Sequence, residues 1–403
     1  MLFKVTQKDE FNLKVNKSSK KILFISRYSS HYKYYAKLVE YLNGKAELVK
    51  LKTFVLPRLT YMDKVKTLDI DDLVDVHIRR KAVRYPILKS NAKLRALVKA
   101  FYRYREKSRA SYYFQLFENH PCETVVLWNG MKQPNRTPYI VAKAAGKKTQ
   151  LFENGLLPNT TVLDPKGVNA VNSLPRSADF YLNWTGDVDY TEKQLVVRKP
   201  HKNRKATGGE VTTPERYIFV PFQVPNDTQI VCHSPWVPDM EAFYERLESA
   251  LNYLKKQPEW TPFTFVIKEH PSWPKSFTHL HDKNPEIIFA NNNNTQDLIE
   301  HSLAVMTINS TVGIEALLLN KNVITLGNAF FNIDGLVHHC HCQQALNQAL
   351  LTIDQQKVNV ELVQKFLAYI KQEYSLPQSW NNLTKPELHM EAVKKRLDTP
   401  YHP

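Results

Sequence analysis

The chain has 403 residues, 43% of them hydrophobic and 11% aromatic, so it can bury a large core and is not a disordered protein. Its 55 basic residues outnumber its 39 acidic ones, which favours an anionic partner. No GxGxxG or GxxxxGK[ST] run is present, which argues against a typical dinucleotide-binding turn or P-loop. No uncharged apolar stretch approaches the ~18–20 residues of a membrane span, and the four cysteines lack CxxC spacing. These features predict a reduced, cytoplasmic protein.

The first half alternates predicted strands and helices. The apolar run KILFIS at residues 21–26 is typical of a strand, and an amphipathic helix follows it. A strand at 123–128, a helix at 137–146 closed by Gly146, and a strand at 149–152 repeat the pattern. This alternation predicts a parallel sheet with helices on both faces.

The positive charge is concentrated between Arg79 and Arg109, where 12 basic residues accompany one acidic residue, Glu106. Five apolar residues recur there at helical spacing: Leu94, Leu97, Val98, Phe101 and Tyr102. The pattern predicts a basic helix over about residues 79–117, suited to an anionic membrane surface or a polyanionic substrate. A solvated helix face above an ordinary core stripe explains it equally well.

A second run of strands and helices follows a polar, basic stretch at 183–215, which we interpret as an insertion. Its predicted strands lie at 216–222, 263–268, 286–290, 303–308 and 322–327, and its helices at 238–257, 310–320 and 358–374. A short helix near 295–302 is expected to begin with Thr295 as its N-cap.

The two halves predict a two-lobed α/β protein. The first lobe would span residues 1–215 and carry the acceptor side, and the second would span 216–375 and bind a donor. A tail at 376–403, without a clear pattern, would pack back on the first lobe. Ligands of such sheets bind at the carboxyl ends of the strands, so chemistry is expected in the cleft between the lobes.

Two loops carry groups that suit an anion. After the strand at 303–308, unpaired helix N–H groups and hydroxyls would hold a phosphate or carboxylate, with a glycine allowing close approach. The residues of this loop are Asn309, Ser310, Thr311 and Gly313. The alternative is that Ser310 or Thr311 is a plain N-cap.

The second loop follows the strand at 263–268 and reads Lys268, Glu269, His270 and Pro271. Lys268 and His270 can donate to a phosphate, and Glu269 can accept from ribose hydroxyls. The alternative is a strand that simply ends in polar residues.

Two carboxylates occupy strand ends on opposite sides of the expected cleft. Asp227 follows the strand at 216–222 and suits a base, a nucleophile or an Asx-turn residue. Glu153 follows the strand at 149–152 in the first lobe. Such a pair is what acid/base and nucleophilic work on a sugar requires. Further cleft contacts are expected from Gln223, Asn154, Ser29 and Ser30.

The motifs VMTINSTVGIEALLLNKNVITLGNAFFNIDGL, IKEHP, QVPND and LFENG, in this order, resemble the bacterial capsule-polysaccharide β-Kdo transferases. They also resemble the related module that caps some lipopolysaccharide O-antigens (glycosyltransferase family 99). The resemblance implies a GT-B-type fold with two Rossmann-like lobes. It implies retaining transfer of 3-deoxy-D-manno-oct-2-ulosonic acid (Kdo) from CMP-β-Kdo. Capsule members read EEGYLRP where this chain reads ENGLLPN, which favours the O-antigen-capping branch.

The resemblance also assigns roles to residues. Asp227 matches the aspartate of the QxxxD motif and is implied to be the nucleophile, while Glu153 matches the acid/base glutamate. The CMP phosphate is implied to lie against His270, Pro271, Ser310 and Thr311, with Lys268 and Glu269 beside it.

The implied partners are CMP-Kdo and a glycan acceptor on a lipid carrier, with no nucleic acid. The enzyme would be cytoplasmic and held by its basic helix at the inner membrane of a Gram-negative bacterium. No metal or other cofactor is expected, because a single phosphate can leave with amide, Lys and His donors. The alternatives are a capsule lipid-linker Kdo transferase, an inverting CMP-sialyltransferase-like enzyme with Asp227 as base, and a basic nucleic-acid-binding protein.

Overall fold

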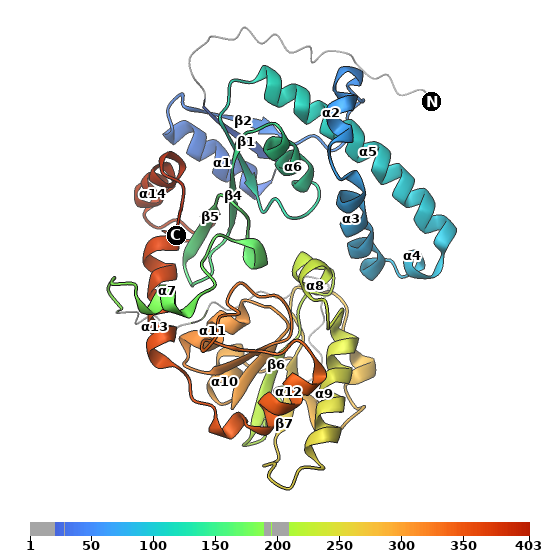
Figure 1. The fold of residues 1–403 in the computed structure, drawn as a ribbon, viewed down its shortest axis with the longest axis vertical. Helices are drawn as coiled ribbons and strands as arrows, with labels where there is room; N and C mark the ends of the chain where they lie inside the picture. The colour runs from blue at the N-terminus through green and yellow to red at the C-terminus, as the bar shows by residue number, and fades with distance from the viewer. Residues whose placement is uncertain (1–20, 28, 189–194, 196–208) are drawn as a thin grey trace.

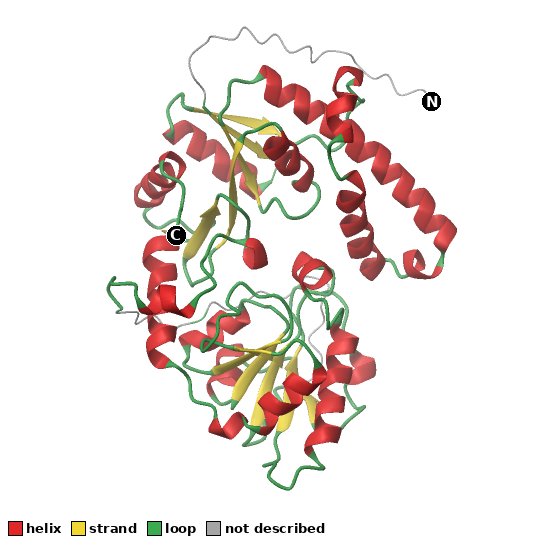
Figure 2. Cartoon of the chain, in the orientation of Figure 1, coloured by secondary structure: helices red, strands yellow, loops and turns green. Residues whose placement is uncertain are grey.

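The computed structural model describes residues 21–27, 29–188, 195 and 209–403. They form two α/β lobes, each built on a six-stranded sheet with helices on both faces (Figures 1 and 2). This is the GT-B-type arrangement expected from the sequence. Most of the polar insertion, at 189–194 and 196–208, lies outside the described residues.

The first lobe contains a sheet of order β12-β5-β4-β3-β1-β2. Its strands are β1 Ile22–Ser26, β2 Ala46–Lys50, β3 Thr124–Trp128, β4 Lys148–Asn154, β5 Thr160–Asp164 and β12 Ser375–Pro377. The strands from β1 to β4 run parallel, β5 is antiparallel to β4, and β12 is antiparallel to β5. Because β1 lies between β2 and β3, the strand order reverses there, which is where sheets of this kind bind their ligands.

Seven α-helices precede the second lobe in the described part of the chain. They are α1 Ser30–Tyr41, α2 Met62–Lys66, α3 Ile70–Arg84, α4 Ile87–Ser90, α5 Ala92–Asn119, α6 Arg136–Ala144 and α7 Ala178–Leu182. The expected single basic helix at 79–117 is therefore wrong, because three helices share this segment. Pro86 disfavours helical geometry at Tyr85, and Asn91 starts α5 by accepting from the Leu94 N–H at 2.9 Å.

The second lobe contains an all-parallel sheet of order β11-β10-β9-β6-β7-β8. Its strands are β6 Tyr217–Pro221, β7 Thr264–Lys268, β8 Ile287–Phe289, β9 Ala304–Thr307, β10 Asn322–Thr325 and β11 His338–His339. The fully buried runs in β6 and β9 are typical of parallel strands covered on both faces. The strand order reverses at β6, which lies between β7 and β9.

Six α-helices cover the second sheet. They are α8 Thr228–His233, α9 Met240–Leu254, α10 Thr295–Glu300, α11 Val312–Leu318, α12 Gln343–Leu351 and α13 Val360–Tyr369. Short 3₁₀ turns lie at Leu59–Tyr61, Asn169–Val171, Thr278–Leu280 and Ile353–Gln355. The N-cap of α10 is Asn294, whose side chain accepts from the Gln296 N–H, and not Thr295, which is the first helical residue.

The end of the chain returns to the first lobe. A π-helical turn at Ile370–Tyr374 leads into β12, which pairs with β5, and into α14 Pro386–Asp398. Met390 and Val393 of α14 join the core cluster that contains Phe24 of β1. The last helix therefore completes the core of the lobe in which the chain begins.

The lobes touch through α8, which Figure 1 shows between them. Arg79 Nη1 of α3 donates to the Val231 carbonyl at 2.7 Å, and Arg80 Nε donates to the Asn226 carbonyl at 2.8 Å. These bonds place α3 of the first lobe against the loop and helix that follow β6. In the described part of the chain, no helix combines the length and apolarity needed to cross a bilayer.

Candidate active site

Glu153 lies at the end of β4 and is held by two donors. Its Oε2 accepts from Asn129 Nδ2 at 2.5 Å, and its Oε1 accepts from the Asn154 N–H at 3.0 Å. Asn129 follows β3 with φ +64°, a left-handed conformation that asparagine tolerates better than most residues. This turn aims the Asn129 amide at the carboxylate of the neighbouring strand. Asn129 was not predicted, although the Asn-Gly pair after a strand was a readable sign of positive φ.

An aromatic group borders Glu153. The His31 ring of α1 stacks on Trp128 at 3.9 Å between centroids, and Trp380 packs against both. Trp380 Nε1 donates to Asn154 Oδ1 at 2.9 Å, so the expected cleft residue Asn154 is tied to the end of the chain. Burial, and to a lesser extent the Lys132 charge, lowers the pKa of His31. The His31 imidazole lies beside the carboxyl end of β3, on Trp128.

Ser29 and Ser30, also predicted as cleft contacts, are exposed where α1 begins. Ser29 Oγ donates to the Arg27 carbonyl at 3.1 Å and does not cap the helix. The sequence analysis therefore singled out the two serines at the start of α1 but not His31, the aromatic residue that follows them.

Asp227 is the N-cap of α8. Its Oδ1 accepts from the Gln229 N–H at 2.9 Å, while its Oδ2 makes no hydrogen bond within the described residues. The helix-capping hydrogen bond expected of an Asx-turn residue therefore uses only Oδ1 of Asp227. Oδ2 makes no such bond in the described part of the chain. Burial lowers the pKa of the neighbouring Arg80 guanidinium, and the Asp227 carboxylate opposes that shift.

Gln223 and Asn309 meet at the point where the second sheet reverses its strand order. Gln223 Nε2 donates to Asn309 Oδ1 at 3.0 Å, and the Asn309 N–H donates to Gln223 Oε1 at 3.1 Å. Asn309 Nδ2 also donates to the Gln229 and His233 carbonyls of α8. Both side chains are buried and occupied by protein partners. The prediction that they contact ligand is therefore corrected, because they hold α8 in place.

The loop from Ser310 to Gly313 also differs from the expectation of free amides. Ser310 Oγ accepts from the Val312 N–H, and the Ser310 carbonyl accepts from the Gly313 N–H. A Cβ on Gly313 would lie 2.7 Å from the Phe331 ring, so glycine is required for packing and not for ligand approach. The Thr311 hydroxyl makes no hydrogen bond within the described part of the chain and is half-buried. The hydroxyls of Ser310 and Thr311, more than the helix amides, are the groups offered to an anion.

Glu269 is turned inward, which corrects its predicted contact with ribose. Only 2% of it is exposed, and its Oε1 accepts from the Ser276 hydroxyl and the Phe277 N–H and pairs with His281 Nε2 at 2.8 Å. It therefore anchors the loop that follows β7.

The other residues of this loop are placed differently. His270 is half-buried before Pro271, and its Nδ1 accepts from the Ser272 N–H at 3.1 Å. With Nδ1 as an acceptor, the ring proton lies on Nε2. Lys268 Nζ donates to the Asn293 carbonyl after β8.

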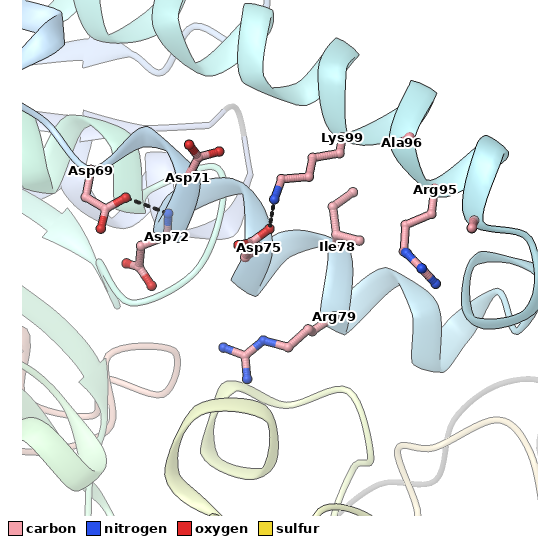
Figure 3. A pocket seen from close by; sticks show the side chains of 10 residues that line it. Asp69, Asp71, Asp72, Asp75, Ile78, Arg79, Arg95, Ala96 and Lys99 are labelled. Carbon is pink, nitrogen blue, oxygen red and sulfur yellow. Dashed lines mark hydrogen bonds and ion pairs between the residues drawn. The ribbon is translucent and has the colours of Figure 1, made fainter.

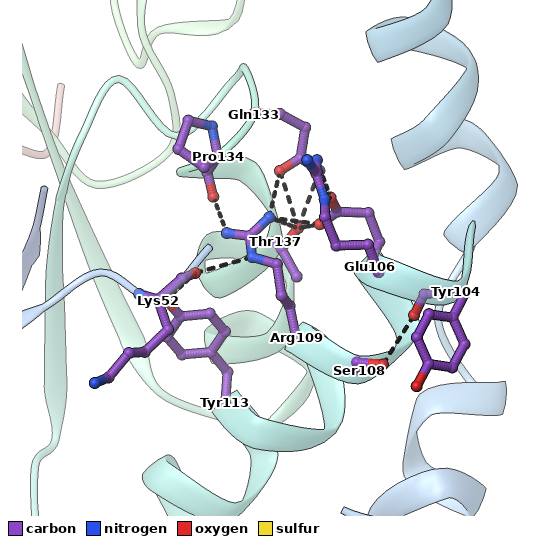
Figure 4. Close-up of polar contacts among 10 residues, drawn as sticks. Lys52, Tyr104, Glu106, Ser108, Arg109, Tyr113, Gln133, Pro134 and Thr137 are labelled. Carbon is purple, nitrogen blue, oxygen red and sulfur yellow. Dashed lines mark hydrogen bonds and ion pairs between the residues drawn. The ribbon is translucent and has the colours of Figure 1, made fainter. Parts of the chain in front are cut away.

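A buried ion pair supports the loop that carries Asn129 (Figure 4). Arg109 and Glu106 of α5 are each 1% exposed and paired at 2.5 Å. Arg109 also donates to Gln133 Oε1 at 2.9 Å and to the Pro134 carbonyl. The basic helix is thereby fixed to the loop at 129–135.

A cavity of about 740 Å³ lies between α3 and α5 (Figure 3). Its lining is mainly charged and comprises Asp69, Asp71, Asp72, Asp75, Ile78, Arg79, Ala92, Arg95, Ala96 and Lys99. Arg79 points from it toward α8. None of the predicted site residues lines this cavity. Across the described ranges, no group of three or more His, Cys, Asp or Glu side chains is arranged to hold a metal ion.

Comparison with known proteins identifies the relatives of this chain. The family described as capsule polysaccharide biosynthesis protein matches residues 197–375. Protein FixF of Sinorhizobium fredii is 37% identical over 292 residues, covering 71% of this chain and 69% of that protein. Capsule polysaccharide export protein KpsS of Escherichia coli is 25% identical, covering 63% of this chain and 78% of that protein.

Among solved structures, the β-Kdo 2,7 transferase KpsC of Thermosulfurimonas dismutans is 13% identical with a TM-score of 0.45. The match covers 93% of this chain and 100% of the solved one.

The two six-stranded sheets, each with helices on both faces and a reversal in its strand order, define a GT-B-type α/β protein. The chain belongs to the capsule polysaccharide biosynthesis protein family.

Proposed function

We propose that this chain is a glycosyltransferase that moves Kdo from CMP-β-Kdo to a glycan acceptor during the synthesis of a cell-surface polysaccharide. Family membership and the motifs of the β-Kdo transferases support this proposal. The observation that carries it is the placement of two carboxylates: Glu153 lies at the carboxyl end of β4 in the first lobe, and Asp227 follows β6 of the second lobe as the N-cap of α8.

The proposed reaction has two displacements. Asp227 Oδ2 attacks the anomeric carbon of Kdo, the bond to the phosphate oxygen breaks, and CMP leaves with the electron pair. An acceptor hydroxyl then attacks the same carbon, Glu153 takes its proton, and the bond to Asp227 breaks. Two inversions retain the configuration. The free Oδ2 of Asp227 suits the first step, because its Oδ1 already caps α8.

We propose that the CMP phosphate is held by the His270 Nε2 proton and the hydroxyls of Ser310 and Thr311, with Lys268 behind them. A phosphate monoester leaving group with such donors requires no divalent metal. The charges of Arg79, Arg80 and Arg136 near α8 would attract the acidic donor.

The pathway is the finer part of the proposal. The relatives that match this chain include the capsule polysaccharide export protein KpsS and the capsule polysaccharide modification protein LipB, which support a capsule-type acceptor. The motif ENGLLPN favours O-antigen capping instead. In either pathway we propose that the enzyme works in the cytoplasm at the inner membrane. Transfer assays with a capsule-type acceptor and an O-antigen acceptor distinguish the two pathways.

Intact mass spectrometry after incubation with CMP-Kdo generated in situ, without acceptor, tests the mechanism. We expect a Kdo-sized mass increment on the wild type and none on Asp227→Asn. Asp239→Asn is the matched control, because Asp239 caps α9 in the same way and asparagine also caps helices.

CMP release only in the presence of acceptor, without an increment, would exclude the nucleophile and favour the inverting alternative. No adduct and no CMP release with any acceptor would exclude CMP-Kdo as the donor.

A further inference from the structure

Six large apolar side chains form an exposed patch on the first lobe. They are Phe54, Leu56, Leu59, Leu97, Phe101 and Tyr104, with exposed fractions of 68%, 75%, 81%, 70%, 50% and 59%. Single exposed apolar residues are ordinary, but a contiguous group of this size marks an interaction surface. We call these six residues the apolar patch.

The apolar patch comes from two segments, which meet at Phe54 and Phe101. Leu97, Phe101 and Tyr104 follow one another at spacings of four and three, so they share one face of α5. Phe54 lies against Phe101 with ring centroids 6.5 Å apart. The Arg58 N–H donates to Ser111 Oγ of α5 at 2.8 Å. This bond holds the segment at 54–59 against α5.

The opposite side of α5 already has its partners. Val98 and Tyr102 pack against the core of the first lobe, and Arg103 and Lys99 pair with Asp71 and Asp75 of α3. The apolar patch is therefore not needed to attach α5 to the protein.

Cations without partners surround the apolar patch. Arg58, Lys93 and Lys107 are exposed and form no ion pair among the described residues. The single acid of α5 before residue 118, Glu106, is buried against Arg109. An apolar face bordered by free cations is what an anionic lipid surface attracts, with aromatic and leucine side chains entering the headgroup region. A second copy of the chain would bring the same cations together and be repelled.

We propose that the apolar patch docks this protein on an anionic bilayer. The sequence indicated a basic helix, but the structure adds Phe54, Leu56 and Leu59, which lie outside that helix. This proposal depends on the exposed surface and does not require that the chain is a transferase. If the proposed function also holds, docking would keep the site near acceptors carried on lipid.

Co-sedimentation of the full chain with vesicles tests the proposal. Vesicles of phosphatidylcholine with phosphatidylglycerol are compared with vesicles of phosphatidylcholine alone. We expect about tenfold stronger partitioning to the anionic vesicles, weakened by salt. The triple variant Leu59→Ser, Leu97→Ser, Phe101→Ser should lose about tenfold or more of it. The charge variant Lys93→Glu, Lys107→Glu should bind anionic vesicles no better than neutral ones.

The matched control is Tyr253→Ser, Leu388→Ser, which removes exposed apolar side chains elsewhere and should bind like the wild type. Circular dichroism and thermal unfolding verify that each variant is folded. Equal binding of wild type and triple variant, or no preference for anionic lipid, would overturn the proposal. A wild-type dimer that the triple variant disperses, without vesicle binding, would assign the patch to a second copy. Transfer to a soluble acceptor by the triple variant separates this result from a failure of the proposed function.

Discussion

Gln223 and Asn309, which lie 86 positions apart in the sequence, are joined by two hydrogen bonds beneath α8. Gln223 follows β6 and Asn309 follows β9, and these neighbouring strands are the ones between which the second sheet reverses its strand order. The two hydrogen bonds therefore join the loops that follow β6 and β9. Asn309 also binds two carbonyls of α8, the helix that Asp227 caps. The position of the proposed nucleophile therefore depends on a pair of buried amides.

Asn309→Ala should lower the free energy of unfolding by about 2–3 kcal/mol, because it leaves Gln223 Nε2 without its buried acceptor and removes one donor each from the Gln229 and His233 carbonyls. Chemical denaturation measures this change. Asn252→Ala, on the exposed face of α9, is the control and should stay within about 0.5 kcal/mol of wild type. Equal stability of the two variants would show that the network contributes little.

Asn129→Gly should leave folding intact and slow the proposed transfer. Glycine accepts φ +64° but lacks the amide that holds Glu153, so we expect kcat to fall about tenfold, equivalent to about 1.4 kcal/mol of barrier. Steady-state kinetics with an acceptor glycan measures the loss. Asn43→Gly, at another positive φ far from Glu153 in the sequence, should retain full activity. Wild-type kcat in Asn129→Gly would show that Glu153 needs no such support.

His77 should make the protein less stable in acid. Its ring packs edge-on against Tyr102 with both nitrogens unpartnered among the described residues, and burial, with the Arg105 and Lys81 charges, lowers its pKa to about 4. The unfolded chain takes up this proton below pH 6.5 and the folded chain only near pH 4, so stability is lost as the pH falls between these values. Allowing for partial exposure, the loss is about 1–2 kcal/mol.

His77→Phe should remove this part of the pH dependence without weakening the protein at pH 8. Unfolding free energies measured across that range provide the check. Identical slopes in wild type and His77→Phe would contradict the assignment.

Glu106→Leu should be far more damaging than the loss of an exposed carboxylate. It leaves the buried Arg109 charge without its partner, which costs about 3–5 kcal/mol. Glu118→Ala, which breaks the exposed pair with Lys64, should cost at most about 1 kcal/mol. Thermal unfolding of both variants ranks them. A similar loss in both would mean that the buried pair is not essential to the first lobe.

Hydrophobic periodicity predicted five of the six strands of the second sheet and three of the six of the first, because strands such as β6 and β9 are short apolar runs between polar turns. It missed the elements whose burial comes from distant partners. β12 has only three residues and ends in Pro377, and it becomes a strand because β5 offers an edge. The stripe of α14 is interrupted by charges and is buried only against β1 and its neighbours.

For the site, the rule that ligands meet strand ends directed attention to both carboxylates, of which Asp227 lies in the predicted loop and Glu153 lies within the last two residues of β4. It could not show which polar groups are already occupied. Glu269 is hydrogen-bonded by a loop seven to twelve residues downstream, and the Phe331 ring leaves no space for a side chain at position 313. Neither contact produces a recognisable pattern in the nearby sequence. Asn129 and His31 escaped prediction because their partners lie on neighbouring strands and helices.

The pairing of β12 with β5 has a consequence for biosynthesis. The ribosome completes β5 about two hundred residues before it completes β12, so the early lobe emerges with an open strand edge and an uncovered apolar face. Only when residues 375–398 are translated can that edge be closed and that face be covered. A polypeptide stopped before Ser375 would therefore aggregate through its first lobe, although the missing strand lies about two hundred positions downstream of β5.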